Sequence, residues 1–361
     1  MNENINVTRP YIPDPDKFKN YVDQIFQSGM LTNGGPLVQE LEQRLEHYLG
    51  VKNLLLVANG TLALQIAYKV LGLKGEVITT PFSFIATTSS LVWEGLTPVF
   101  ADIDEHTLCI NPQEIEKGIT ENTSAILPVH VYGNACDIDA IQSLAKKNTL
   151  PVIYDAAHAF AVNYKGQSVL NYGDISTLSF HATKLFHTIE GGALIIKDDE
   201  LYRKAQRMIN FGFEKGEIVD IGINAKMNEF EAAMGLCVLD DMQDILAKRK
   251  FIWETYKNNI SEQLLKVNWN VDGEPNYSYY PILFSKEDKL LKSISQLKDV
   301  NIHPRRYFYP SLDQLHSIVK EGNCPISHAL SKRVLCLPIY PGLEPEVIKT
   351  ISGIVNSCEG N

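Results

Sequence analysis

Short apolar segments alternate with segments of helical periodicity between residues 54 and 209 of this chain. Such alternation is typical of a mostly parallel sheet with helices on both faces, so it predicts an α/β fold. The expected strands are Leu54–Val57, Glu76–Thr79, Thr97–Phe100, Ala125–Val129, Val152–Tyr154, Thr177–Phe180 and Ala193–Ile196. The expected helices between and after them include Phe84–Trp93, Ile138–Lys147 and Leu201–Ile209.

The chain is long enough for a second, smaller lobe, since it has 361 residues of which 45% are hydrophobic. We expect an N-terminal segment and large domain over residues 1–245 and a smaller C-terminal domain over residues 246–361. The first contains two leading helices, Asp16–Gln27 and Pro36–Tyr48, joined by the turn-rich loop Ser28–Gly35. A long helix is expected at Asn228–Ala247 and a further one at Arg249–Leu264. The smaller lobe then has strands near Tyr279–Phe284 and Val334–Leu337, and helices at Glu287–Leu297 and Pro345–Val355.

Composition excludes several classes of protein. The formal net charge of −10 argues against a nucleic-acid binder. The sequence has no run of 18 apolar residues, so we expect no membrane-spanning helix. The N-terminus has neither the basic nor the apolar region of a signal peptide. The six cysteines form no C-x-x-C pair, as expected of buried free thiols in a reducing cytoplasm. The histidines form no H-x-x-x-H or H-E-x-x-H pair, so we expect no metal site.

Lys184 lies in the connection between two apolar strands, Ile175–Phe180 and Ala193–Ile196. Burying an ammonium group is costly unless its pKa falls or the nitrogen is covalently bound. A lysine that must be neutral to act suggests a Schiff base with a carbonyl cofactor such as pyridoxal phosphate (PLP).

Two further features match the needs of PLP. Asp155 ends the apolar strand Pro151–Tyr154, where open α/β sheets place their ligands, and a carboxylate there could keep the pyridine nitrogen protonated. The sequence Asn59-Gly60-Thr61 links a strand to a helix, so it directs free N–H groups at an anion such as a phosphate. Each feature also has an ordinary structural interpretation, because aspartates and glycines commonly begin helices.

Several motifs occur in an order that resembles the DegT/DnrJ/EryC1/StrS family of sugar aminotransferases, and the resemblance runs nearly end to end. The motifs are Gly29–Gly34, Asn59–Thr61, Pro81–Thr87, Pro128–Gly133, Asp155–His158, Ser179–Lys184, Glu190–Gly192, Gly222–Glu229, Arg306–Pro310 and Leu337–Pro338. This family belongs to fold-type I of the PLP-dependent enzymes. The resemblance therefore implies a large PLP-binding domain with a mostly parallel central sheet and a smaller C-terminal α/β domain.

The resemblance also implies roles for individual residues. Lys184 matches the lysine that binds PLP, and Asp155 matches the acid paired with the pyridine nitrogen. His158 matches the residue beside the phenolic oxygen of PLP, and Phe84 the aromatic that stacks on the ring. The expected phosphate contacts are Gly60, Thr61, Ser179 and, from the neighbouring subunit of a homodimer with shared active sites, Asn224.

Other positions are less clearly assigned. Tyr132 and Tyr309 are candidates for the substrate pocket. Lys226 stands where many members carry arginine, which keeps the charge but loses the planar fork. His181 and His187 are expected to be packing or surface residues.

The resemblance implies transamination, because members that dehydrate carry histidine at the position of Lys184. The expected reaction moves an amino group from L-glutamate to a nucleotide-linked keto-sugar, most in keeping with C4 of dTDP-4-keto-6-deoxyglucose. The product would be dTDP-4-amino-4,6-dideoxyglucose, a precursor of surface polysaccharide such as lipopolysaccharide O-antigen. Amination at C3, a UDP- or GDP-linked substrate, a different PLP reaction and a non-catalytic regulator that binds PLP or a nucleotide sugar remain open alternatives.

Overall fold

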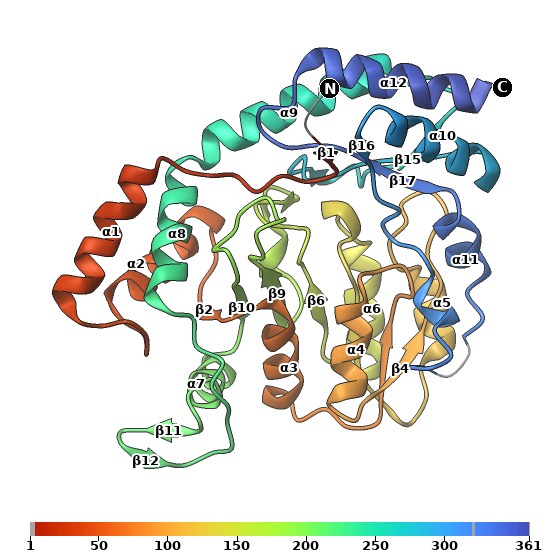
Figure 1. The fold of residues 1–361 in the computed structure, drawn as a ribbon. Coiled ribbons are helices and arrows are strands. Elements are labelled where there is room, and N and C mark those ends of the chain that lie inside the picture. The colour runs from red at the N-terminus through yellow and green to blue at the C-terminus, as the bar shows by residue number, and fades with distance from the viewer. Residues whose placement is uncertain (1–3, 320–321, 361) are drawn as a thin grey trace.

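The computed structural model describes residues 4–319 and 322–360 of the chain. Figure 1 shows a larger domain around a central sheet, with a smaller domain packed above it. None of the described helices is long and apolar enough to cross a membrane.

Seven strands line up across the larger domain. Their spatial order is β2-β10-β9-β6 in one hydrogen-bonded group and β5-β3-β4 in another. Two parallel bridges, Ile126 to Val152 and Val129 to Asp155, join β5 to β6. Only β10 runs antiparallel to its neighbours β2 and β9, so the predicted mostly parallel sheet is confirmed. The bounds are β2 Leu54–Val57, β3 Glu76–Thr79, β4 Thr97–Phe100, β5 Thr123–Leu127, β6 Ile153–Asp155, β9 Ile175–Ser179 and β10 Gly192–Ile196.

Both faces of this sheet are covered by helices, and its strands alternate between two hydrophobic clusters. In β2, Leu54 and Leu56 belong to one cluster, whereas Leu55 and Val57 belong to the other. The side chains of a strand point to opposite faces in turn, so a strand covered on both faces, such as β2, is apolar along its whole length. The helices of this domain are α1 Pro15–Ser28, α2 Pro36–Leu49, α3 Gly60–Val70, α4 Ile85–Trp93, α5 Pro112–Gly118, α6 Ile138–Asn148, α7 Asp199–Met208 and α8 Glu229–Asp240.

The helix expected to run to Ala247 ends earlier. Helix α8 stops at Asp240, and α9 (Met242–Asn259) begins after Asp241. The Asp241 carboxylate accepts hydrogen bonds from Lys17 Nζ at 2.9 Å and Tyr11 Oη at 3.0 Å. These partners are more than 220 residues away in sequence, so the local helical pattern could not reveal the break.

The smaller domain has its own hydrophobic cluster beneath α9, α10 (Glu287–Asp299) and α12 (Pro345–Gly360). Its antiparallel sheet contains β13 (Leu265–Lys266), β15 (Tyr280–Leu283) and β17 (Val334–Leu337). The start of the described chain also joins this domain, since β1 (Ile5–Asn6) pairs with β16 (Ile302–His303). The predicted boundary at residues 245/246 falls within α9. The remaining elements are β7 Asn163–Tyr164, β8 Gln167–Ser168, β11 Phe213–Glu214, β12 Glu217–Ile218, β14 Gly273–Glu274, α11 Pro325–Ser331 and the 3₁₀ turns Val131–Gly133, Val169–Asn171 and Leu312–Gln314.

Candidate functional site

A cavity of about 370 Å³ lies at the carboxyl ends of β6 and β9, with the smaller domain forming one wall. Open α/β sheets bind their ligands at this end of the strands. The cavity brings together seven of the residues expected from the sequence to contact the cofactor. These are Gly60, Thr61, Phe84, Asp155, His158, Ser179 and Lys184.

Lys184 lies in the long connection between β9 and β10 and is partly buried. Its backbone N–H donates to the carbonyl of His181 at 2.8 Å, which holds the turn in place. Burial lowers the pKa of Lys184 from 10.5 to about 8, and the negative charge of Asp155 opposes this shift. A substantial fraction of the amine is therefore neutral near physiological pH and can attack a carbonyl carbon.

Asp155 ends β6 and is buried. Its Oδ2 accepts a hydrogen bond from Thr87 Oγ1 at 2.7 Å, and its Oδ1 accepts one from the Ala157 N–H at 3.1 Å. Burial raises the pKa of Asp155 above its ordinary value, whereas these two donors and the charge of Lys184 act in the opposite direction. The two hydrogen bonds thus fix the orientation of the carboxylate, which lines the cavity and can accept a further hydrogen bond there.

The turn between β2 and α3 forms the opposite end of the cavity. Asn59 is the N-cap of α3, and its side chain accepts the Leu62 N–H at 2.9 Å. The next residue, Gly60, lies against β9, because a Cβ built on it would be 2.8 Å from Ser179 Cβ. This packing places the first N–H groups of α3 beside the Ser179 hydroxyl, which is an arrangement suited to a phosphate group.

His158 is buried with its ring stacked on Phe308, the two centroids being 5.6 Å apart. The backbone N–H of Tyr132 donates to His158 Nδ1 at 3.2 Å, so in the neutral ring the hydrogen is on Nε2. Burial, with a smaller effect of Lys184, lowers the pKa of His158 well below its ordinary value. His158 is therefore a neutral hydrogen-bond donor beside the cavity.

Phe84, the N-cap residue of α4, lines the cavity with 56% of its surface exposed. An aromatic ring so exposed at the wall of a cavity is available to stack on a planar ligand.

Neither of the two tyrosines expected in the substrate pocket lines this cavity. Tyr132 is fully buried, and its hydroxyl donates to the carbonyl of Tyr307. Tyr309 is exposed beside Arg306, whose guanidinium lies 3.6 Å from the centre of the tyrosine ring. Tyr279, Tyr307 and Phe308 line the cavity instead.

The two histidines near the lysine differ in environment. His187 is buried, with Nε2 donating to the carbonyl of Tyr11 at 2.7 Å and Nδ1 accepting the Ile189 N–H at 3.3 Å. It is a packing residue, as expected. His181 is exposed at the cavity and its Nδ1 lies 2.8 Å from Thr183 Oγ1.

Asn224 and Lys226 are also outside the set of described residues that line the cavity. Asn224 is exposed, and Lys226 donates to Asn210 Oδ1 at 2.8 Å with its ammonium 5.1 Å from the centre of the Phe211 ring. Both follow the exposed hairpin β11–β12, at the lower left of Figure 1.

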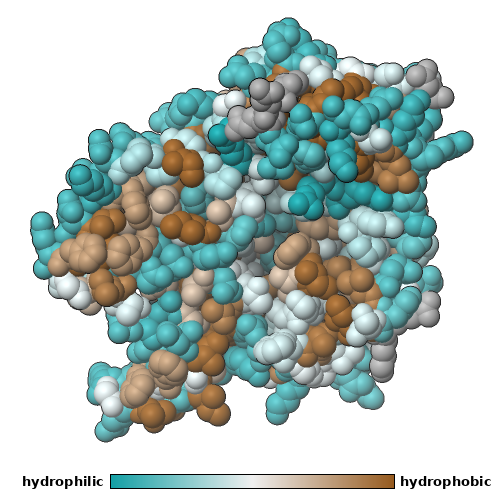
Figure 2. All heavy atoms as spheres, viewed as in Figure 1, coloured by the Kyte–Doolittle hydropathy of each residue, from teal (hydrophilic) through white to brown (hydrophobic). Residues whose placement is uncertain are grey.

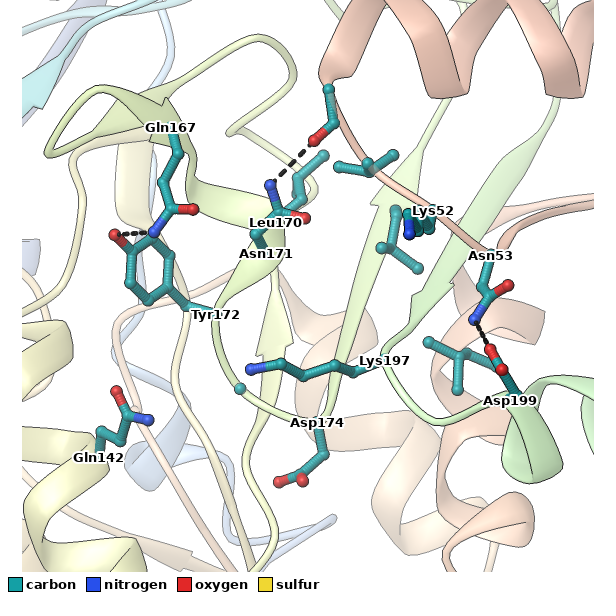
Figure 3. A pocket seen from close by; sticks show the side chains of 15 residues that line it. Lys52, Asn53, Gln142, Gln167, Leu170, Asn171, Tyr172, Asp174, Lys197 and Asp199 are labelled. Carbon is teal, nitrogen blue, oxygen red and sulfur yellow. Dashed lines mark hydrogen bonds between the residues drawn. The ribbon is translucent and has the colours of Figure 1, made fainter.

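A second, larger cavity of about 730 Å³ lies at the other end of the strands, next to Asn53 before β2, Asp174 before β9 and Lys197 after β10 (Figure 3). Many of its polar side chains bond to one another or to the backbone. Asn53 donates to Asp199 at 2.9 Å and Gln167 to Tyr172 at 2.7 Å. This cavity lacks a converging set of groups comparable to Lys184 and Asp155.

The residues of the first cavity fit PLP. The N–H groups at the start of α3, held against Ser179 by the close approach of Gly60, suit a phosphate. Asp155 suits a protonated ring nitrogen, and the Nε2–H of His158 suits a phenolic oxygen. By contrast, residues 4–319 and 322–360 contain no group of three or more His, Cys, Asp or Glu side chains arranged to hold a metal ion.

Known proteins resemble this chain over nearly its whole length. Residues 14–356 match the DegT/DnrJ/EryC1/StrS aminotransferase family. The chain is 44% identical to dTDP-4-amino-4,6-dideoxy-D-glucose transaminase of Shigella dysenteriae, over 99% of this chain and 100% of the relative. It is 33% identical to GDP-perosamine synthase of Escherichia coli O157:H7, over 94% and 95% of the two chains. Among solved structures, DesI in the presence of its TDP-sugar product superposes with a TM-score of 0.94 and 32% identity, over 99% of this chain and 94% of DesI.

Proposed function

Because the chain belongs to the DegT/DnrJ/EryC1/StrS aminotransferase family, we propose that it transfers an amino group from L-glutamate to C4 of dTDP-4-keto-6-deoxyglucose. The product would be dTDP-4-amino-4,6-dideoxyglucose. The membership confirms the expected fold-type I architecture, the classification as an aminotransferase and the use of PLP. The observation that carries the proposed chemistry is the meeting of Lys184, Asp155 and the Gly60 turn in one cavity.

Each residue has a distinct part in binding. The N–H groups at the start of α3, with the hydroxyls of Thr61 and Ser179, would hold the phosphate. Asp155 would accept the ring N–H, His158 would donate its Nε2–H to the phenolic oxygen, and Phe84 would cover one face of the ring. PLP, when bound, supplies an electron-accepting pyridinium ring that stabilises the charge left by removal of a proton from carbon.

Lys184 would move the protons. Its pKa of about 8 leaves enough neutral amine to take the proton from the α-carbon of the donor amino acid. The same Nζ would then return the proton to a neighbouring carbon. The same proton transfers would run in the opposite direction when the keto-sugar receives the amine. The amino donor must leave before the sugar enters this single cavity, so ping-pong kinetics are expected.

The choice of sugar rests on the relatives. The identity of 44% to a dTDP-sugar transaminase, against 33% to a GDP-sugar enzyme, supports a dTDP-linked substrate. The product would serve surface polysaccharide such as O-antigen, made from nucleotide sugars in the cytoplasm.

A homodimer would complete the site. Exposed apolar side chains lie between the end of β12 and Asn224, and Figure 2 shows apolar surface at this corner of the molecule. They include Ile218, Val219, Ile221 and Ile223, of which Ile221 is 87% exposed. Burying this surface against a second copy would be favourable and would bring Asn224 to the partner's phosphate site.

The test is product analysis. The purified protein is incubated with L-glutamate and, separately, with dTDP-4-keto-6-deoxyglucose, a 3-keto isomer, and UDP- and GDP-linked 4-keto-sugars, and each product is identified by NMR. Conversion of the dTDP-4-keto-sugar at a kcat/KM at least about tenfold above the others is expected. Preference for a different sugar would refute the proposed substrate, and no turnover of any sugar by a PLP-loaded protein would favour a regulator.

A further inference from the structure

Four buried hydroxyl groups lie on α4 or just before it, on Ser83, Thr87, Thr88 and Ser90. This is the helix whose N-cap residue, Phe84, reaches the cavity. Only Thr87 among the four reaches the acid of the site, with its Oγ1 2.7 Å from Asp155 Oδ2. The neighbouring Thr88 Oγ1 is buried and has no hydrogen-bond partner within the described part of the chain. Thr87 and Thr88 are therefore adjacent on the same helix and equally buried, but only Thr87 contacts the site.

The hydrogen bonds at Thr87 have a definite direction. A hydroxyl carries one hydrogen, and that of Thr87 is donated to the Asp155 carboxylate. Ser83 Oγ lies 2.7 Å from Thr87 Oγ1, so Ser83 must donate in that contact. The chain thus runs from Ser83 to Thr87 to Asp155, with every hydrogen directed towards the carboxylate.

This direction sets what Asp155 can bind on its cavity side. One lone pair of Oδ2 is taken by Thr87 and one of Oδ1 by the Ala157 N–H. Both oxygens then present only acceptor sites to the cavity, provided that the carboxyl group is ionised. A protonated ring nitrogen matches such a surface, whereas a neutral ring nitrogen, itself an acceptor, does not.

We infer that Thr87 is a positioning residue of this site, whose hydroxyl, oriented by Ser83, holds Asp155 as an ionised acceptor and so selects PLP with a protonated ring nitrogen. The inference rests on the proposed PLP site and adds to it residues outside the expected contacts. Burial alone raises the pKa of Asp155, so a donor that favours the charged form is needed at this position.

The test replaces Thr87 with valine, which keeps the β-branched shape and removes the hydroxyl. Thr88→Val is the matched control, because it makes the same change one residue away on a hydroxyl without a partner. Thr87→Ser keeps the hydroxyl and removes only the methyl group, so it should behave as the unaltered protein. The measurements are the dissociation constant of PLP from the apoprotein and the nitrogen-15 chemical shift of bound, ring-labelled PLP, which reports protonation of the ring nitrogen directly.

The expected result is that Thr87→Val raises the dissociation constant of PLP by about tenfold or more and moves the nitrogen-15 resonance towards that of a neutral pyridine. Thr88→Val and Thr87→Ser should leave both values near those of the unaltered protein. If Thr87→Val matches Thr88→Val in both measurements, the inference is wrong.

A second variant covers the case in which Thr87→Val does not fold. Ser83→Ala leaves the Thr87–Asp155 bond in place but frees the Thr87 hydroxyl to rotate, so a shift of a few-fold in the same direction is expected. An unchanged nitrogen-15 resonance in Ser83→Ala would then refute the inference. Neither readout involves a sugar, so a protein that binds PLP normally and aminates nothing would refute the proposed function and leave this inference standing.

Discussion

Gly60 and Ser179 pack so closely that a Cβ built on Gly60 would lie 2.8 Å from Ser179 Cβ and 3.1 Å from Ser179 Cα. Gly192, at the start of β10, is equally restricted, since its Cβ would lie 2.6 Å from the backbone carbon of Asn59. The Asn59–Gly60 turn thus meets the end of β9 and the start of β10, more than 100 residues further along the chain, with no side chain between them. This contact brings the N-terminus of α3 to the end of β9 and creates the expected phosphate site.

Gly60→Ala is predicted to weaken both the fold and the binding of PLP. The added methyl group meets Ser179 at the backbone and Cβ, which cannot move away as a flexible side-chain end could. We expect the free energy of unfolding to fall by about 1–3 kcal/mol and the dissociation constant of PLP to rise by about tenfold. Chemical denaturation and fluorescence titration would measure these changes.

The matched control is Gly353→Ala in α12, where the Cβ meets nothing within 4 Å and a helical alanine is favoured. This variant should be as stable as the unaltered protein or more so. Equal PLP affinity in the two variants would contradict the role assigned to the Gly60 turn.

Lys184→Ala is predicted to abolish the visible absorbance of lysine-bound PLP and to lower kcat by about ten-thousandfold. The loss follows because Lys184 is the lysine of the cavity that the structure places beside Asp155. Absorbance spectra and steady-state assays with L-glutamate would test it. Lys197→Ala, at the second cavity, should keep both properties. Normal turnover in Lys184→Ala would refute the mechanism.

The reactivity of Lys184 should depend on pH with a midpoint of about 8 in the apoprotein. Below this pH the neutral fraction falls about tenfold for each pH unit, and the rate of modification by an amine-specific reagent should fall with it. Pulse labelling followed by mass spectrometry of the peptide that contains Lys184 would give the profile.

The Asp155→Asn variant tests whether the charge of Asp155 raises the pKa of Lys184. The Asp155 charge favours the ammonium form, so its removal should move the midpoint for Lys184 to lower pH. A shift to higher pH would show that the two groups are not coupled as the structure indicates.

Mixed dimers would test whether Asn224 acts across a subunit interface. Lys184→Ala and Asn224→Ala subunits should each be nearly inactive alone. In a randomly mixed population, half of the dimers contain both kinds, and each of these has one intact site. We expect recovery of about a quarter of the unaltered activity. No recovery, despite confirmed mixing by mass spectrometry, would indicate that Asn224 serves its own subunit or none.

Much of the fold could be predicted because the strands and helices carry local patterns. Residues 54–57 form β2 as expected, and their position between two hydrophobic clusters explains why they are apolar without alternation. The break at Asp241 was not predictable, since it depends on contacts with Tyr11 and Lys17.

The sequence by itself determined which reactive groups the proposed site contains. Along the chain, the Gly60 turn and Asp155 adjoin recognisable strands, and Lys184 lies in the connection between two others. Their proposed roles follow from the chemistry of these groups and from backbone geometry, which local sequence encodes.

Tertiary structure alone decided which other side chains share the cavity. It buried Tyr132, placed Tyr279 and Phe308 against His158, and joined Thr87 to Asp155 across 68 positions of sequence. Packing between distant segments determines such contacts, and so does the burial that lowers the pKa of Lys184 and raises that of Asp155. A residue's neighbours in space set its desolvation and hydrogen bonds, and these appear only when the chain has folded.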